Sequence, residues 1–159
     1  MATGDTKQLT TISSEASGAL WSPDGKKIAA ITDQSGEQEI AIFDATGPAP
    51  AKTLTSQGRG WIFDPIWSPD SKSIAYADLT LTLFVVDAES GKVTTVDQSK
   101  AGEIRDYAFS PDGKWLAYSL PRSALDGLGY GATELRLYSL EQAKSFPVST
   151  GFTDDKNPA

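Results

Sequence analysis

The stretch WSPDGK at residues 21–26 returns as WSPDSK at residues 67–72 and as FSPDGK at residues 109–114. The aromatic positions are 46 and then 42 residues apart, which is the length of a four-stranded propeller blade. The sequence therefore predicts an all-β fold, a β-propeller segment built from about three four-stranded antiparallel blades.

The repeated stretch has the chemistry of a tight turn. Proline presets φ at the second turn position, aspartate bonds to nearby backbone amides, and glycine accepts the left-handed conformation that closes a short hairpin. Because turn geometry explains every residue, we interpret the stretch as a hairpin corner and not as a functional Ser-Asp pair. Ser71 replaces the glycine in the second copy, and a serine in the left-handed region costs on the order of 1 kcal/mol.

Alternating apolar and polar residues place strands on both sides of each corner. The first strands of units one and two are expected to end at 20–21 and 66–67, and that of unit three is expected at 107–109. The later strands are expected at 27–32, 39–44 and 52–55, at 73–77, 83–87 and 92–96, and at 115–119, 134–138 and 145–148. The expected units are an orphan outer strand at 7–13, blade 1 at 17–56, blade 2 at 59–98, blade 3 at 103–150 and the start of a further blade at 151–159.

Apolar residues occupy successive positions in the second strand of each unit, as in Ile28-Ala29 and Ile74-Ala75. Successive residues of a strand point to opposite faces, so both faces of these sheets must be covered. We therefore expect Trp21, Trp67 and Phe109 to fill the space between stacked sheets, as core residues and not as a platform for a ligand.

Composition excludes several functions. The 159 residues carry a net charge of −7, which disfavours nucleic acid and anionic membrane as partners. The chain contains no histidine and no cysteine, which removes Ser-His-Asp and Cys-His catalysis and the commonest metal ligands. We predict no catalytic residue, no metal and no cofactor, and a soluble chain whose compartment, periplasmic or cytoplasmic, stays open.

Three blades leave two sheet edges that must pair with something, since closed propellers have four to eight blades. We expect a part or half of a six- or seven-bladed ring. Either the chain is a segment of a longer one, or copies associate so that two halves complete a ring.

The phrases WSPDGKKIAA, WSPDSKSIAYA and FSPDGKWLAYS, at residues 21–30, 67–77 and 109–119, resemble TolB-type propeller repeats. Residues 63–70 and 102–112 are similar to the propeller region of tricorn-type proteases. This resemblance implies a gate or docking platform attached to a separate serine-protease domain, which would carry the nucleophile and its histidine. No catalytic residue of that family can be transferred to this chain.

One end of the blades is the candidate binding face, because the blade-to-blade connections and the loops between second and third strands meet there. The candidate residues are Arg59, Trp61, Asp64, Arg105, Asp106 and Tyr130. Glu103, Asp154, Asp155 and the glycine-rich insertion at 121–131 are expected at the same end. The alternative interpretation is structural: ion pairs that pin the connections, a mobile loop, and a solvated acidic pair.

The function predicted first is a noncatalytic propeller segment that provides a protein or peptide interaction surface, or a substrate-access surface, in a larger tricorn-like protease. Its partner would be a protein or peptide, with either a second copy or the rest of a longer chain completing the propeller. Two alternatives stay open. One is a self-associating half-propeller with a structural role, and the other is a propeller enzyme that uses Asp64 and Asp106 as paired carboxylates.

Overall fold

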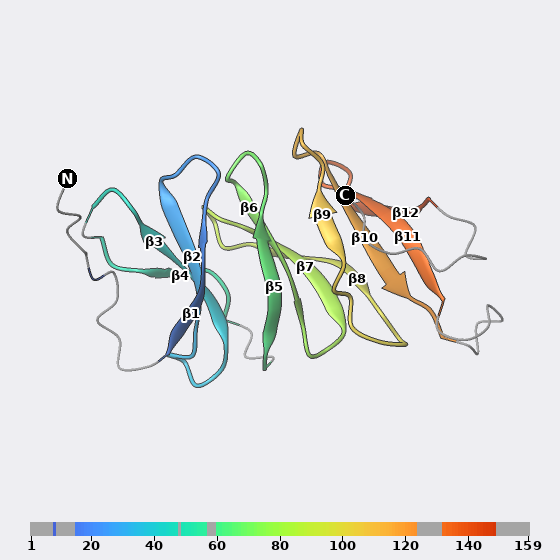
Figure 1. Cartoon of the computed structure of the whole chain (residues 1–159), viewed down its shortest axis with the longest axis horizontal. Coiled ribbons are helices and arrows are strands. Elements are labelled where there is room, and N and C mark those ends of the chain that lie inside the picture. Colours follow the sequence, from blue (N-terminus) through green and yellow to red (C-terminus); the bar gives the residue numbers. More distant parts are fainter. Residues whose placement is uncertain (1–7, 9–14, 48, 57–59, 124–131, 149–159) are drawn as a thin grey trace, which may run out of the picture.

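The computed structural model describes residues 8, 15–47, 49–56, 60–123 and 132–148. Within these residues the chain forms three four-stranded antiparallel sheets, and each sheet keeps its strands in chain order. Figure 1 shows the sheets side by side, in the order in which the chain makes them. The described residues include no helix of the length and hydropathy needed to cross a membrane.

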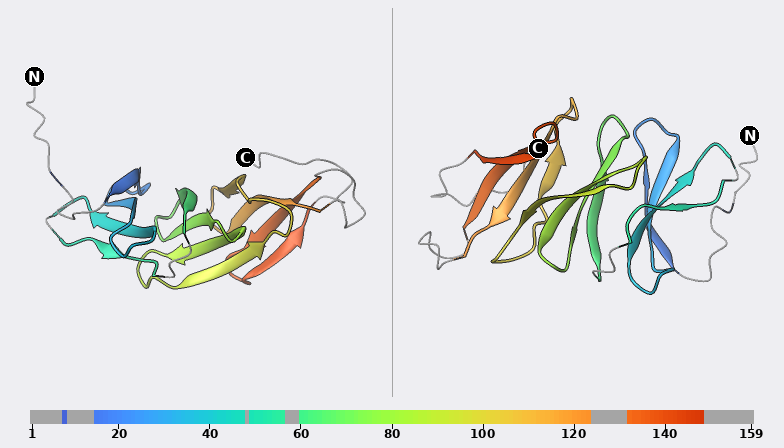
Figure 2. Two further views of the ribbon diagram at one scale, coloured as in Figure 1. Left: turned by 90° about the horizontal axis from the view of Figure 1, so that it is seen from below. Right: turned by 180° about the vertical axis from the view of Figure 1, so that it is seen from behind.

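Each sheet corresponds to one copy of the repeated stretch. The first contains β1 (Ala16–Trp21), β2 (Lys27–Thr32), β3 (Glu39–Asp44) and β4 (Lys52–Thr53). The second contains β5 (Ile62–Trp67), β6 (Ser73–Asp78), β7 (Thr82–Asp87) and β8 (Val93–Gln98). The third contains β9 (Tyr107–Phe109), β10 (Trp115–Pro121), β11 (Thr133–Ser139) and β12 (Lys144–Pro147). The views of Figure 2 show the first strands β1, β5 and β9 along one side of the row.

The repeated stretch forms the hairpin corner between the first and second strands, as predicted. Asp24 Oδ1 accepts hydrogen bonds from the Ser22 hydroxyl at 2.7 Å and from the Lys26 N–H at 3.1 Å. The other two corners repeat both bonds. Ser71 has φ 61°, which confirms that a serine occupies the left-handed position.

Both faces of the middle sheet are buried, as the successive apolar residues predicted. Ile74 packs with residues of the first sheet such as Ala29 and Ile40. Its neighbour Ala75 points the other way, into a cluster with Leu116 of the third sheet. Ile74 and Ala75 are both fully buried, so the two largest core clusters fill the layers between the sheets. A smaller cluster of Ala30, Ala41 and Phe43 belongs to the first sheet alone.

The three aromatic residues that open the motif differ in their environments. Trp67 packs against the core between the first and second sheets, and its Nε1–H donates to the carbonyl of Leu20 at 3.1 Å. Phe109 packs against the core between the second and third sheets. The expectation that Trp21 is also a core residue was wrong, since 61% of it is exposed. Among the described residues no sheet precedes β1 that could cover this ring.

Two predicted units lie outside the residues that the structure describes. The orphan strand at 7–13 falls there except for Gln8, and so does the start of a further blade at 151–159. The unit boundaries and the number of blades in a complete ring stay predictions.

Candidate binding face

The starts of the first strands and the loops between second and third strands lie at the same end of the sheets. The Glu15 N–H donates to Asp33 Oδ1 at 2.8 Å in the first sheet. In the next connection the Ile62 N–H donates to Gln38 Oε1, also at 2.8 Å. Here we define the connection face by Trp61, Asp64, Leu79, Glu103 and Arg105.

Arg105 is the centre of the charged part of this face. Its Nε lies 2.8 Å from Glu103 Oε2, and its Nη1 lies 3.4 Å from Asp64 Oδ2 on the neighbouring sheet. The guanidinium also lies over the ring of Phe63, 4.2 Å from its centroid. The hydrogen bond to Glu103, with the negative charges of Glu103 and Asp64, raises the pKa of Arg105. Exposed ion pairs contribute little stability. The main effect of this cluster is therefore to hold the guanidinium group of Arg105 in one orientation.

A buried hydroxyl holds the backbone beneath this cluster. The Tyr107 hydroxyl shares its proton between the carbonyls of Phe63, at 2.8 Å, and Asp64, at 2.7 Å. Burial raises the pKa of this hydroxyl. Asp64 has φ 46°, at a point where the pairing register of β5 with β6 shifts. Positive φ is strained for a residue with a side chain, and Gly18 takes a similar conformation, φ 63°, at the register shift of the first sheet.

Two exposed apolar side chains lie at the same end of the second sheet as the start of β5, which carries Asp64. Trp61 is 63% exposed and Leu79, in the turn between β6 and β7, is 51% exposed. Gly60 brings the connection close to this turn, since a Cβ on Gly60 would lie 3.0 Å from Leu79 Cδ1. Large apolar side chains gathered on a surface mark interaction sites. Sequence reasoning found Trp61 but missed Leu79, because the turn contains two leucines, Leu79 and Leu81, and nothing in its sequence indicates which of them is exposed.

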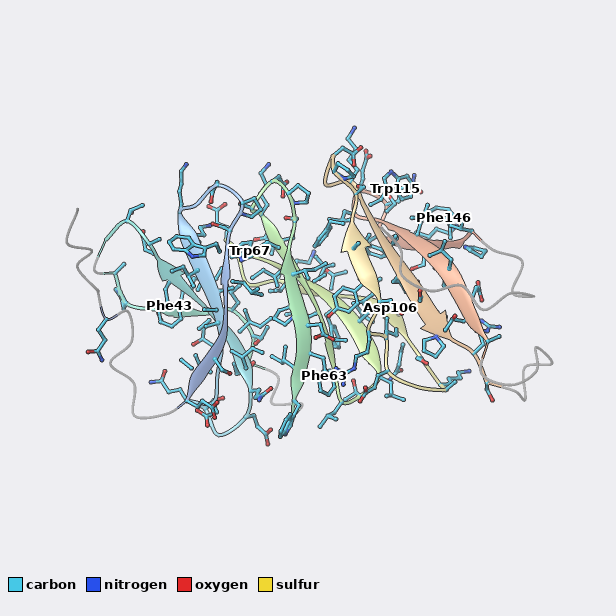
Figure 3. All side chains as sticks on the ribbon, in the orientation of Figure 1. Phe43, Phe63, Trp67, Asp106, Trp115 and Phe146 are labelled. Atoms are coloured by element: carbon cyan, nitrogen blue, oxygen red, sulfur yellow. The ribbon has the colours of Figure 1, made fainter. Side chains whose placement is uncertain are left out.

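The structure places four of the six candidate residues. Arg105 and Asp64 are brought together, Trp61 is exposed, and Arg59 and Tyr130 lie outside the described residues, as do Asp154 and Asp155. Asp106 is partly buried, and its backbone carbonyl accepts from the Ser119 N–H at 2.9 Å. Figure 3 labels Phe63 on β5 and Asp106 beside the start of β9, on neighbouring sheets.

The arrangement does not favour chemistry by paired carboxylates. The Asp64 side chain is 55% exposed and is paired with Arg105, whereas a general acid requires an enclosed carboxyl group with a raised pKa. Within the described part of the chain no three His, Cys, Asp or Glu side chains gather as metal ligands.

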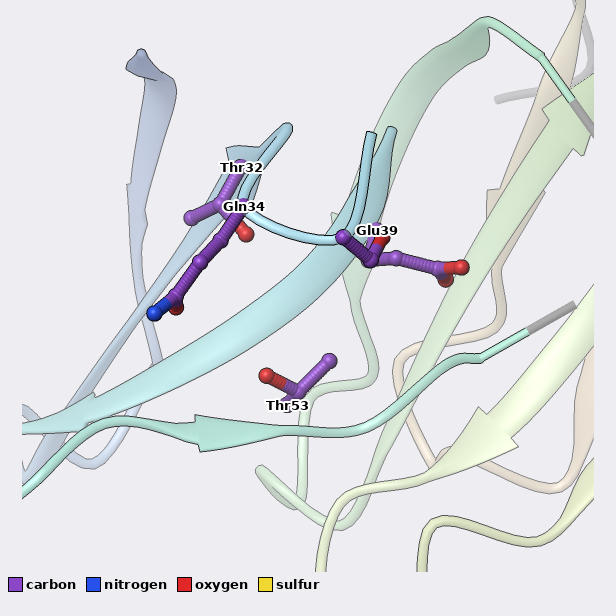
Figure 4. Close-up of a pocket in the computed structure, with 5 residues that line it drawn as sticks. Thr32, Gln34, Glu39 and Thr53 are labelled. Atoms are coloured by element: carbon purple, nitrogen blue, oxygen red, sulfur yellow. The ribbon is translucent and has the colours of Figure 1, made fainter. Parts of the chain in front are cut away.

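A hollow of about 170 Å³ on the first sheet is lined by hydroxyl, amide and carboxylate side chains, those of Thr32, Gln34, Ser35, Glu39 and Thr53. Figure 4 shows the Glu39 carboxylate extending away from Gln34. Glu39 is buried, and its carboxylate accepts a hydrogen bond from the Thr55 hydroxyl. This contact gives the carboxylate a structural role beside the hollow.

Comparison with known proteins identifies relatives. Residues 3–159 match the family described as the tricorn protease second beta propeller domain. The tricorn protease of Thermoplasma volcanium is 30% identical over 129 residues, which are 81% of this chain and 12% of that protein. The chain thus spans about an eighth of this relative's length.

Solved structures match the same fold. The crystal structure of the tricorn protease superposes with a TM-score of 0.76 at 24% identity, covering 85% of this chain and 13% of that chain. TolB from Acinetobacter baumannii superposes with a TM-score of 0.60 at 18% identity, covering 86% and 32%. These likenesses establish that the three sheets are propeller blades.

Proposed function

The chain belongs to the family of tricorn protease second β-propeller domains, and from this premise we propose that it is a noncatalytic interaction surface within a larger protease. The connection face would bind a protein or peptide segment, or control its access to a catalytic domain elsewhere. The observation that carries this proposal is the exposure of Trp61 and Leu79 at the end of the second sheet where Asp64 pairs with Arg105.

The chemistry of the face favours an apolar segment that lacks acidic residues. Trp61 and Leu79 offer apolar contact area, and an aromatic ring provides much of it with few rotatable bonds. Among the described residues of the face, Glu103 and Asp64 outnumber Arg105, the cation with which they pair. The excess negative charge here, in a chain of net charge −7, repels acidic partners.

A peptide array tests this proposal. The chain, labelled with a fluorophore at its amino terminus, is applied to immobilised dodecapeptides of varied sequence, and dissociation constants are then measured for the peptides retained. We expect apolar peptides to be retained, and the double substitution Trp61→Ala with Leu79→Ser to weaken their binding at least tenfold. Trp21→Ala removes an equally exposed tryptophan from a different surface, so this control should bind like the unmodified chain. Equal retention of the double variant would contradict the proposal.

Self-association is the second candidate, and one difference between equivalent residues favours it. Trp67 donates to the Leu20 carbonyl of the preceding blade, whereas Trp21 is exposed. At the other end of the row, Ala117 and Leu137 pair across β10 and β11 as Ala75 and Val85 pair across β6 and β7. The pair in the middle blade is buried by the next blade, but Ala117 and Leu137 are only partly buried.

We propose that two copies associate through these two unlike ends, with Trp21 of one copy against the third blade of the other. Sedimentation equilibrium measures this directly. A dimer whose dissociation constant rises about tenfold on Trp21→Ala, but not on Trp61→Ala, would support the idea. A monomer at all accessible concentrations would exclude it without affecting the peptide proposal.

A further inference from the structure

A cleft of about 390 Å³ lies between the second and third blades. It is at the opposite end of the sheets from the connection face, since β6 begins beside the cleft at Ser73 and ends at Asp78, next to Leu79. Its walls come from the last three strands of the second blade, and from β11 and the turn after it in the third blade. The lining residues are Ser73, Val85, Asp87, Lys92, Thr94, Tyr138, Leu140, Glu141 and Ala143.

The turns that follow the third strand of each blade correspond residue by residue. The N–H groups of Ala45, Ala88 and Leu140 each donate to the carbonyl of the lysine in the hairpin corner of their own blade. These three residues therefore have equivalent positions. Glu89 follows Ala88 in the second blade, and Glu141 follows Leu140 in the third. Glu141 is thus the equivalent of Glu89.

A lysine connects the first blade to this turn of the second blade. Lys52 pairs with Ile42, and its Nζ donates a hydrogen bond to the carbonyl of Glu89. Thr94 pairs with Val85. Because Ile42 and Val85 each lie three residues before the N–H that bonds to the corner lysine, Thr94 has the position in the second blade that Lys52 has in the first. A threonine side chain is too short to reach the next blade as the lysine does, and it lines the cleft instead.

Three hydroxyl groups without a partner line the cleft, those of Ser73, Thr94 and Tyr138. Among the described residues no hydrogen bond is found for any of them. Tyr138 is only 3% exposed, and buried polar groups normally have a hydrogen-bond partner. Burial raises the pKa of the Tyr138 hydroxyl, so near neutral pH its oxygen is uncharged and can accept a hydrogen bond from a cation.

Two carboxylates also line the cleft. Asp87 Oδ1 accepts bonds from the N–H of Ser90, at 2.6 Å, and from its hydroxyl, at 2.7 Å. These bonds lower the pKa of Asp87, with a smaller contribution from the charge of Lys52. Asp87 is therefore ionised near neutral pH. Asp87, Glu141 and the exposed Lys92 make no ion pair among the described residues.

We propose that this cleft binds the lysine side chain of a protein or peptide partner. The ammonium group of lysine has three donors and no acceptor, which suits a lining of carboxylate and hydroxyl oxygens. Val85, Leu140 and Ala143 line the same cleft and offer apolar surface to the methylene stem. The volume lies within the roughly 300–1,000 Å³ of small-ligand sites. The contact of Lys52 with the next blade shows that this place in the fold accommodates a lysine. This site is separate from the connection face and does not rest on its function.

Four probes test the chemistry of the ligand. They are acetyl-Gly-Lys-Gly-amide, the same peptide with glutamine or glutamate in place of lysine, and 1,5-diaminopentane. Each is titrated into the ¹⁵N-labelled chain, and the backbone amides of Lys92, Thr94 and Glu141 are followed by NMR. We expect saturable shifts with the lysine peptide and none with the glutamine peptide. Shifts with the glutamate peptide, or with the diamine but not with the lysine peptide, would overturn the proposal.

A variant that fills the cleft from within locates the binding. Thr94→Lys places a lysine where Lys52 lies in the first blade, so its own ammonium group should compete with the peptide and weaken binding about tenfold. Thr95→Lys is the matched control. It adds the same charge at the next residue, which is exposed and points to the opposite face of β8. Equal binding of the lysine peptide by the two variants would overturn the proposal.

Charge-removing variants test the sign of the site. Glu141→Gln should weaken binding of the lysine peptide roughly two- to fivefold, as expected for an exposed charge, whereas Lys92→Gln removes a like charge and should strengthen it. Glu37→Gln, the control, removes an exposed carboxylate from the first blade. Weaker binding by Lys92→Gln, or equal binding by Glu141→Gln and Glu37→Gln, would overturn the proposal. Trp61→Ala with Leu79→Ser should leave the affinity unchanged, so this site and the connection face are tested independently.

Discussion

The backbone N–H of Asp24 donates a 3.0 Å hydrogen bond to the hydroxyl of Ser71, which joins the hairpin corner of the first blade to that of the second. Ser71 has φ 61°, close to the 71° of Gly25 and the 69° of Gly113 at the same place in the other corners. The serine therefore keeps a strained conformation and gains a contact between blades that a glycine could not make.

Substitutions at Ser71 should separate the strain from the hydrogen bond. We expect Ser71→Ala to lower the free energy of unfolding by about 1 kcal/mol, since the bond is lost and the strain stays. Ser71→Gly loses the same bond but relieves the strain, so it should be about 0.5–1 kcal/mol more stable than Ser71→Ala. Urea denaturation measures both variants. An alanine variant as stable as the unmodified chain would show that the bond contributes nothing.

The same contact should be transferable to the third corner. A Cβ on Gly113 would lie 3.8 Å from Asp70 Cγ, an ordinary contact distance, so a serine hydroxyl there has room to reach the Asp70 corner. We expect Gly113→Ser to be about 1 kcal/mol more stable than Gly113→Ala in urea denaturation. At Gly25 a Cβ would meet nothing within 4 Å. Gly25→Ser and Gly25→Ala should therefore be equally stable, and a serine advantage there as well would contradict the explanation.

The sequence predicts local structure well where the chemistry is local. β2 and β3 have the predicted bounds, because each is fixed by the corner and by alternation of its own residues. β5 ends at Trp67, as predicted, but the sequence did not indicate its start at Ile62. The positive φ of Asp64 and the register shift interrupt the alternation by which its start would have been recognised.

Relationships between blades were less predictable, because they depend on distances that a sequence does not contain. Whether Trp21 is exposed depends on whether another blade packs against the first one. The residues around Trp21 in the sequence do not indicate this. The pairing of Arg105 with Asp64 joins residues 41 apart in the chain, and no local pattern indicates it. The sequence placed both residues at one end of the blades, but it suggested Asp106 as the ion-pair partner of Arg105 and Arg59 as that of Asp64.

Asp64 offers a test of strain at the connection face. Gly18 takes the corresponding place in the first blade with φ 63°, so Asp64→Gly should relieve the strain. It should also lose only an exposed ion pair, which contributes roughly 0–1 kcal/mol. We expect the free energy of unfolding of Asp64→Gly to stay within about 0.5 kcal/mol of the unmodified chain, and that of Asp64→Ala to fall by about 1 kcal/mol. Equal stability of the two variants would mean that positive φ is not costly here.

Tyr107→Phe tests the support beneath the same residue. The substitution removes the hydroxyl that donates to the carbonyls of Phe63 and Asp64, while the ring and its packing remain. Losing a buried donor to two carbonyls should lower the free energy of unfolding by about 1–2 kcal/mol. Tyr138→Phe is the control, since no hydrogen bond of its hydroxyl is found among the described residues, and its cost should be smaller. Hydrogen exchange at Asp64 and Ile66 should accelerate in Tyr107→Phe and not in the control.

Acid should destabilise the blades through carboxylates that accept hydrogen bonds in tight turns. The N–H of Ser90, followed by its hydroxyl, lowers the pKa of Asp87 below 3.8. Hydrogen bonds from serine hydroxyls, those of Ser22 and Ser110, are the main cause that lowers the pKa of Asp24 and Asp112. A carboxyl group whose pKa is lower in the folded state than in the unfolded state stabilises the fold fully above the unfolded pKa. That stabilisation disappears as the pH falls through the folded pKa.

The free energy of unfolding should therefore be constant near neutral pH and fall below about pH 4. An asparagine side chain at position 87 cannot ionise. The free energy of unfolding of Asp87→Asn should therefore be lower than that of the unmodified chain at pH 7, but it should decline less as the pH falls. Urea denaturation of both proteins at about pH 7, 4 and 3 measures the difference. Glu37→Gln is the control, because it removes a carboxylate from an exposed position in the loop between β2 and β3. If Asp87→Asn and Glu37→Gln show the same decline, the hydrogen bonds from Ser90 do not contribute to the acid sensitivity of the fold.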